Sequence, residues 1–288
     1  MAVITRPLLS LLGLAVLGVS VQAGPVKIFP PLPDRTEAAW TRYASLTEER
    51  IAAQLKDPKR FLALDFGATG AADRQALQAG LMPVSKVETR SNGSEIDVPE
   101  AWVHHWRGAV LIRGARLDQV FTRLQEEVPG TGKGDVIASR ILGRDGTHVR
   151  TYIKLRRTGR LILAYDFVYN TYHDVVFTRR TPATAVSTSV ATKIAEMYHP
   201  GSPEEREFGP GEDNRLLQRW NSYWHYEEVP AGVIAECESI TLSRRGPFGF
   251  GRSVADGTAQ ESMEKALVNL RDFFATPRRT PPASSPAR

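Results

Sequence analysis

The sequence predicts an α+β fold in which a curved antiparallel β-sheet wraps around a long C-terminal α-helix, preceded by a helical and hairpin-forming N-terminal extension. Two observations support this fold. Several strand-like runs separated by turn residues fill residues 108–243, and residues 258–276 carry apolar side chains on one face at helical spacing. Because a one-sided antiparallel sheet must bury its apolar face, one long amphipathic helix is a suitable cover for it.

The predicted strands alternate apolar and polar residues and end at turn residues such as Asp145-Gly146, Thr158-Gly159 and Pro182. A short helix is expected between the first two strands, at residues 117–127. The closing helix is expected to begin with a capping box formed by Thr258 and Glu261. The strands are expected at residues 109–113, 136–142, 147–156, 160–178, 183–198, 219–228 and 233–243.

The N-terminal extension, residues 34–100, is less regular. Residues 34–57 have helical spacing, with a possible second helix capped by Thr47. Residues 61–66 alternate and are apolar enough for a strand, whereas the pattern of residues 67–83 is ambiguous. Residues 84–98 predict a hairpin that turns at Asn92-Gly93.

The first 23 residues have the pattern of a cleavable signal peptide. Arg6 precedes an apolar run from Leu8 to Val19, and Val21-Gln22-Ala23 is a small-x-small cleavage pattern. This run is shorter than the ~20 apolar residues of a membrane-spanning helix, although an uncleaved anchor is the alternative. We therefore expect a periplasmic or secreted protein cleaved after Ala23. Its parts would be a linker and extension (24–100), a main domain (101–276) and a disordered Pro-rich tail (277–288).

Composition excludes several classes of protein. With 42% hydrophobic and 24% charged residues the chain is an ordinary globular sequence. Of the net charge of +5, four positive charges lie in the signal peptide and the tail (Arg6, Arg278, Arg279 and Arg288), which leaves +1 on the body. Such a body lacks the basic footprint of a nucleic-acid-binding protein.

Catalytic and metal-binding patterns are weak. The adjacent His104 and His105 point to opposite faces of a strand, and no His-x-His, Cys-x-x-Cys or His-Glu-x-x-His motif is present, so we predict no metal and no cofactor. Cys237, the single cysteine, is expected to be a buried, inert thiol. Glu236 and Glu238 are expected to form a solvated pair, with one of them near His225. The glycines at 130, 132 and 134 are expected to shape a mobile rim rather than a phosphate loop.

The order of elements, together with a few motifs, resembles the helix-grip fold of the START and SRPBCC superfamily, in particular exported bacterial START-like proteins of uncharacterised function. The similarity spans about residues 102–274 and is most specific in the last strand. The motifs that carry it are His104-His105-Trp106-Arg107-Gly108, Asn221-Ser222-Tyr223-Trp224, residues 232–244 and Gln260-Glu261-Ser262-Met263. The resemblance implies a cavity for a lipid, a sterol or another apolar molecule; it implies no reaction, since one fold hosts many functions.

The inward face of the predicted sheet follows from strand pairing. A turn at residues 229–232 would pair Trp224 with Cys237 and Ser222 with Ser239, which places large rings beside small side chains and leaves room for a ligand. A side-chain-filled core is the alternative. The predicted ligand-binding residues are Val149, Thr151, Ile153, Leu163, Tyr165, Phe167, Tyr169, Ser222, Trp224, Tyr226, Ala235, Cys237, Met263, Leu267 and Leu270.

Three functions are compatible with these patterns. The first is a carrier that binds an apolar, lipid-like small molecule, with no obligate protein partner. The second is an enzyme of the same fold, such as a cyclase or hydrolase, in which Tyr165, Tyr226, His148 or His225 would converge. The third is a scaffold with a filled core. The segment 244–251, with Phe248 and Phe250, could gate a pocket or make a transient contact with a membrane surface.

Overall fold

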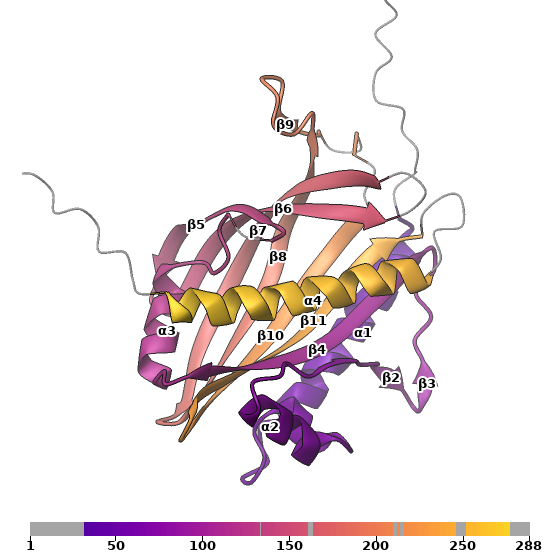
Figure 1. Ribbon diagram of the computed structural model, residues 1–288. Coiled ribbons are helices and arrows are strands. Elements are labelled where there is room, and N and C mark those ends of the chain that lie inside the picture. Colours follow the sequence, from indigo (N-terminus) through magenta and orange to yellow (C-terminus); the bar gives the residue numbers. More distant parts are fainter. Residues whose placement is uncertain are drawn as a thin grey trace, which may run out of the picture.

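The computed structural model describes residues 32–132, 134–160, 164–209, 212–213, 216–245 and 252–276, and shows a curved antiparallel sheet with helices on both of its faces (Figure 1). The nine-stranded sheet has the order β1-β4-β11-β10-β8-β7-β6-β5, with the short β9 paired to β8. The helices are α1 (Asp34–Gln54), the 3₁₀ helix η1 (Ala63–Phe66), α2 (Gly70–Gln78), α3 (Leu117–Glu126) and α4 (Arg252–Ala275). The strands are β1 (Val84–Lys86), β2 (Arg90–Ser91), β3 (Ser94–Glu95), β4 (Ala101–Arg113), β5 (Val136–Asp145), β6 (His148–Arg160), β7 (Ala164–Thr181), β8 (Thr184–Tyr198), β9 (Arg206–Glu207), β10 (Leu217–Val229) and β11 (Gly232–Arg244).

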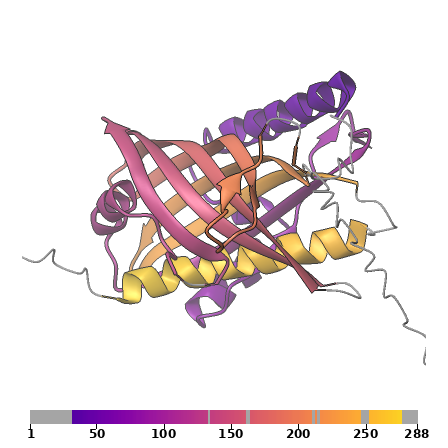
Figure 2. The ribbon, with the colours of Figure 1, turned by 90° about the horizontal axis from the view of Figure 1, so that it is seen from above.

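The long helix α4 and the N-terminal helix α1 lie on opposite faces of the sheet (Figure 2). We call the face that carries α4 the inner face and the face that carries α1 the outer face. Within the described part of the chain, no helix is long and apolar enough to cross a membrane. The predicted α+β architecture, a curved antiparallel sheet around a C-terminal helix, is therefore confirmed.

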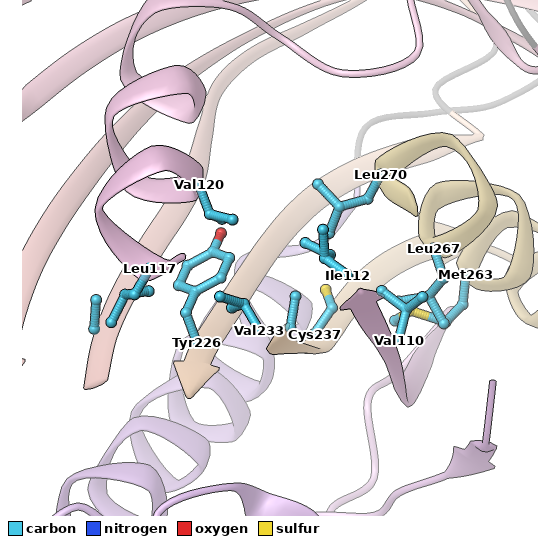
Figure 3. Close-up of a cluster of buried hydrophobic side chains, with 12 residues drawn as sticks. Val110, Ile112, Leu117, Val120, Tyr226, Val233, Cys237, Met263, Leu267 and Leu270 are labelled. Carbon is cyan, nitrogen blue, oxygen red and sulfur yellow. The ribbon is translucent and has the colours of Figure 1, made fainter. Parts of the chain in front are cut away.

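Contact between α4 and the sheet depends on a glycine. Leu267 and Met263 pack over Gly108 of β4, and a Cβ atom at Gly108 would lie only 2.7 Å from Leu267 Cδ1. Both helix residues belong to an inner-face cluster with Val110, Ile112 and other side chains, drawn in Figure 3. Helix α4 contacts mainly β4 and the adjoining edge strand β1, whereas α3 contacts β8, β10 and β11.

The pairing of β10 with β11 is the one expected from the sequence. Trp224 pairs with Cys237, Ser222 with Ser239 and His225 with Glu236, and the turn lies at residues 229–232. The hairpin turn at Asn92-Gly93 is also present between β2 and β3, where both residues have positive φ, at 51° and 80°. The remainder of that predicted hairpin is absent, because β1 pairs with β4 instead.

Several predicted N-terminal boundaries were wrong. Helix α1 is continuous, and Thr47 caps no second helix, because its buried hydroxyl donates to the Tyr43 carbonyl at 2.9 Å. Residues 61–66 contain η1 rather than a strand. The Asp65 carboxylate accepts the Leu62 N–H at 3.1 Å, and the Glu236 carboxylate accepts the N–H groups of Ala63 and Leu64, so the turn satisfies donors that a strand would have directed to a neighbour.

Other boundaries differ within the main sheet. The expected break at Thr158-Gly159 lies inside the β6–β7 ladder, where Gly159 pairs with Tyr165. Strand β4 begins at Ala101 rather than 109. Helix α4 begins at Arg252, so the Thr258–Glu261 capping box was wrong: Thr258 is already in the helix, and its carbonyl accepts the Ser262 hydroxyl at 2.8 Å. Glu261 pairs with Lys265 instead, at 2.9 Å.

The N-terminal extension covers the outer face of the sheet. Trp40, Tyr43 and Ile51 of α1 pack with side chains of β10 and β11, while Leu62, Leu64 and Leu77 pack on β4 and β11. This cover explains why residues of β11 that point outward are buried. Glu236 and Glu238, expected to be solvated, are both 0% exposed, so that expectation was wrong.

Candidate functional site

A cavity of about 730 Å³ lies on the inner face, bounded by the sheet, by α4 and by the chain that follows α3. Its floor is formed by β4, β6, β7, β8, β10 and β11. Four of the chain's five tryptophans line it: Trp102, Trp106, Trp220 and Trp224. Their distribution follows strand alternation, because side chains two residues apart on β4 or β10 share a face. The rings of Trp224 and Tyr226 stack, with centroids 6.1 Å apart.

Ten of the fifteen predicted ligand-binding residues line this cavity: Thr151, Ile153, Phe167, Tyr169, Ser222, Trp224, Tyr226, Cys237, Met263 and Leu270. Val149, Ala235 and Leu267 are buried but do not line it; Ala235 and Leu267 belong to the packed cluster between the sheet and α4. Leu163 lies outside the described residues, as does the side chain of Tyr165.

Sequence reasoning missed much of the rim and one side of the floor. On β4, Trp102, His104 and Trp106 alternate in the way that a longer strand would require, and this signal was available in the sequence. Glu127, Pro129 and Asp135 belong to a loop that no periodicity places. Strand alternation also places Leu155, Trp220, Ser239 and Thr241 on the inward face, and all four line the cavity. The further lining residues that were not predicted are Leu124, Val128, Val136, Arg157, His173, Val175, Phe177, Ser187, Ser189, Leu216, Leu217, Ser243, Arg244, Thr258, Ala259, Ser262, Lys265, Ala266 and Asn269.

The loop of residues 127–135 connects the rim of the cavity to α4. Asp135 bonds Arg157 of β6 at 2.6 Å and Lys265 of α4 at 2.8 Å, so one carboxylate joins the sheet to the helix. Burial lowers the pKa of Arg157, and the charge of Asp135 opposes that shift. Gly130 approaches Asn269 so closely that a Cβ atom would lie 2.8 Å from its Nδ2. The expected rim role of these glycines agrees with this position; mobility of the loop stays a prediction.

His104 ties the start of α4 to the sheet. Its Nδ1 lies 2.7 Å from Asp256 Oδ1 and its Nε2 lies 2.6 Å from Ser243 Oγ. Lys86 of β1 bonds the same Asp256 at 2.6 Å. Burial opposes ionisation of this carboxyl, but the His104 and Lys86 contacts prevail and lower its pKa to about 2. Ion pairs thus join α4 to the rest of the fold at two points, one at Asp256 and one at Lys265.

The outer face holds a second polar cluster, which is sealed beneath α1. His105 Nε2 lies 2.6 Å from Glu238 Oε1, and His105 Nδ1 lies 2.9 Å from the Tyr43 hydroxyl. Arg50 also bonds Glu238. Burial raises the pKa of Glu238, but His105 and Arg50 outweigh it and lower the value to about 2. For Glu236, burial prevails over Arg107 and the η1 N–H groups and raises the pKa to about 7. His104 and His105 point to opposite faces, as expected.

The residues proposed for catalysis do not come together in the described structure. Tyr226 lines the cavity on the inner face, whereas His225 lies on the outer face with its ring against Phe61, at a centroid distance of 5.6 Å. His148 is exposed at the β5–β6 turn. Burial raises the pKa of the Cys237 thiol well above its usual value, which agrees with an inert side chain. The expected gating segment is described only at Arg244 and Arg245, so Phe248 and Phe250 lie outside the described residues.

No family model and no curated protein matches the chain. Among solved structures, human StAR-related lipid transfer protein 5 is 15% identical, with 83% of this chain and 98% of that one covered and a TM-score of 0.42. A STAR-related lipid transfer protein fragment from Xanthomonas axonopodis is 15% identical, over 67% and 99%, with a TM-score of 0.37. An aromatase/cyclase from Streptomyces sp. R1128 is 11% identical, over 60% and 94%, with a TM-score of 0.39.

These matches are distant, and none of them assigns a ligand or a reaction to this chain. The architecture can be judged on the chain's own elements. One curved antiparallel sheet, with β4 beside β11 and β5 at the far edge, carries the C-terminal helix on its inner face. The chain therefore has a START-like helix-grip fold.

Proposed function

We propose that this protein binds an apolar, lipid-like small molecule in the cavity between the sheet and α4. The observation that carries the proposal is the cavity itself: about 730 Å³, with a wall whose accessible surface is mainly apolar, although Ser, Thr, His and charged side chains also line it. Ligand sites in proteins have volumes of roughly 300 to 1,000 Å³ and the same kind of lining. The cavity is thus large enough for a molecule of lipid size.

A filled core is the alternative, and the packing argues against it. Protein interiors are close-packed, and the voids that remain are seldom much larger than a water molecule. The cavity wall includes Phe167, Trp224 and Leu270, and these side chains lack dispersion contacts where no other atoms face them. An apolar ligand in the cavity would supply those contacts. Beside the cavity, Val110, Val233 and Leu267 are fully buried in one apolar cluster, so the space is a local feature of the inner face.

Native mass spectrometry tests this proposal directly. Protein purified from its natural host, without detergent, is expected to show an added mass that disappears after extraction with organic solvent. The extracted protein should then regain the mass when lipid extract is returned to it. If the purified protein carries no bound molecule, and if no fraction of the lipid extract raises its melting temperature, the carrier proposal fails.

We further propose that the protein is exported, with cleavage after Ala23. Residues 1–23 lie outside the described residues, so the proposal depends on their sequence pattern alone. Expression of the full chain in a bacterial host should yield mature protein in the periplasm or medium, with Gly24 as its first residue by intact mass. Replacing Ala23 by Arg should block cleavage and leave the longer chain with the membranes. Recovery of uncleaved wild-type protein from the cytoplasm would contradict export.

A further inference from the structure

Polar side chains cross the middle of the cavity floor in a continuous row. We define this polar belt as Thr151 of β6, His173 of β7, Ser189 of β8, Ser222 of β10 and Ser239 of β11. Thr151 pairs with His173, Ser189 with Ser222 and Ser222 with Ser239 in the strand register, and all five line the cavity. The belt therefore spans five strands of the sheet.

The belt has apolar surface on both sides. Along β7, His173 lies between Phe167 and Tyr169 in one direction and Val175 and Phe177 in the other, and all four of these side chains line the cavity. Along β10, Ser222 lies between Trp220 and Trp224. A molecule that fills the cavity thus meets polar groups at its centre and apolar walls at its ends.

The partners of Thr171 and Ser189 determine which atoms donate and which accept in the hydrogen bonds at His173. The Thr171 hydroxyl donates to the Ile153 carbonyl at 3.0 Å, so its oxygen accepts the Nε2–H of His173 at 3.0 Å. Burial lowers the pKa of His173 to about 4, so the ring is neutral near pH 7. His173 Nδ1 is then an acceptor, and the Ser189 hydroxyl donates to it at 3.2 Å. The one hydroxyl proton of Ser189 is consequently in use.

The two serines on β10 and β11 are also satisfied within the protein. The Trp220 indole N–H donates to the oxygens of Ser222 and Ser239, at 2.9 and 3.1 Å. Ser222 donates to Ser239 at 3.3 Å, and Ser239 donates to the Asn221 carbonyl at 3.5 Å. Each hydroxyl has only one proton, so these bonds leave neither serine with a free donor.

Thr151 is the exception in the belt. Thr151 is 7% exposed and lines the cavity, and among the described residues its hydroxyl has no hydrogen-bond partner. The hydroxyl is not one of the described polar atoms that are both buried and unpaired, so it is open to the cavity. An acceptor that reaches this hydroxyl from the cavity replaces water there and gains one net hydrogen bond. The belt therefore presents one free donor at its β6 end.

We propose that the ligand carries a hydrogen-bond-accepting oxygen, such as a carbonyl, in the middle of an otherwise apolar molecule, and that the Thr151 hydroxyl donates to this oxygen. This inference rests on the proposed function and specifies its ligand class. It distinguishes internally oxygenated molecules from plain hydrocarbons, for which Thr151 would remain without a partner. The Ser189, Ser222 and Ser239 hydroxyls line the same region with their protons already committed to the protein.

A matched pair of probes tests the inference. Fluorene and 9-fluorenone have the same flat outline and differ by one central carbonyl with apolar rings on both sides. Binding to delipidated protein can be followed by the fluorescence of the cavity tryptophans and checked by calorimetry. The wild type is expected to prefer the ketone by roughly fivefold, the factor that one net hydrogen bond supplies.

Thr151→Val keeps the shape of the side chain and removes the hydroxyl, so the preference for the ketone should fall to about one. Ile153→Val is the control on the same strand and face: it should weaken both probes alike and keep the preference. If Thr151→Val retains the wild-type preference, the assignment of Thr151 is wrong although the cavity binds ligand. If neither probe binds to wild-type protein, the inference and the proposed function both fail. Equal melting temperatures of the variants would exclude misfolding as the cause.

Discussion

Replacing Glu238 by Gln is expected to lower the free energy of unfolding by about 3 kcal/mol at pH 7, because it removes one partner from a buried ionic cluster. Glu238 is fully buried and contacts both His105 and Arg50. A neutral amide keeps the volume but leaves Arg50 of α1 and the buried His105 without the carboxylate that both contact. Urea unfolding followed by circular dichroism measures the loss.

The same variant has a defined pH dependence. The folded pKa of Glu238 is about 2, below the ordinary value of 4.5, so the carboxylate stabilises the fold fully above pH 4.5 and loses this contribution as the pH falls towards 2. The shift corresponds to about 3 kcal/mol. The difference in free energy of unfolding between wild type and Glu238→Gln should accordingly be constant in buffers from about pH 5 to about pH 7. It should shrink in more acidic buffer.

Glu37→Gln is the matched control for this prediction. Glu37 also joins α1 to the sheet, through Arg219 at 2.8 Å, but both side chains are partly exposed. Its loss should cost less than about 1 kcal/mol, as for other exposed ion pairs. If both variants lose the same stability, the buried cluster has no special role in holding α1 against the outer face.

Ile153→Asp is expected to weaken binding of an apolar ligand on the order of 100-fold, because the ligand would have to strip water from a carboxylate in the cavity wall. Ile153 lines the cavity at a half-buried position. Without ligand, water in the open cavity can solvate the new charge, so the variant should remain folded. Titration with Nile red, a neutral apolar dye, measures the change.

Arg150→Asp provides the control on the same strand. Arg150 is exposed and lies on the opposite face of β6, since it is three positions away from Ile153 and side chains alternate between the faces of a strand. Its replacement introduces the same side chain without touching the cavity, so dye affinity should stay within about twofold of wild type. If Ile153→Asp binds the dye as tightly as the wild type does, the dye binds outside the cavity. The assay would then no longer support the cavity as the ligand site.

The sequence predicted the elements whose periodicity is strong. Alternation along β10 and β11, joined by a short turn, was enough to predict their register, because a shift by one residue would have moved every aromatic ring to the other face. The spacing of Met263, Leu267 and Leu270 likewise predicted a helix with one buried face. Six correctly predicted cavity-lining positions followed from these patterns, and four more followed from the alternation along β6 and β7.

Burial on the outer face was decided only by tertiary structure. Glu236 and Glu238 alternate with apolar residues in the way that solvent-facing side chains do, and nothing local to β11 shows that α1 and η1 cover them. Covering these carboxylates requires partners from distant parts of the chain, Arg50 and the η1 N–H groups. Short segments such as residues 61–66 were misassigned for the same reason, since few local residues distinguish a turn from a strand.

The sequence by itself therefore determined a sheet with one aromatic face and a helix to cover it, because strand and helix periodicity are properties of neighbouring residues. The tertiary structure decided that α4 packs mainly on β4, that the N-terminal helices cover the opposite face, and that the Thr151 hydroxyl lines the cavity without a partner among the described residues. Those features depend on the distances between elements that pack together in space. The spacing of residues along the chain does not determine those distances.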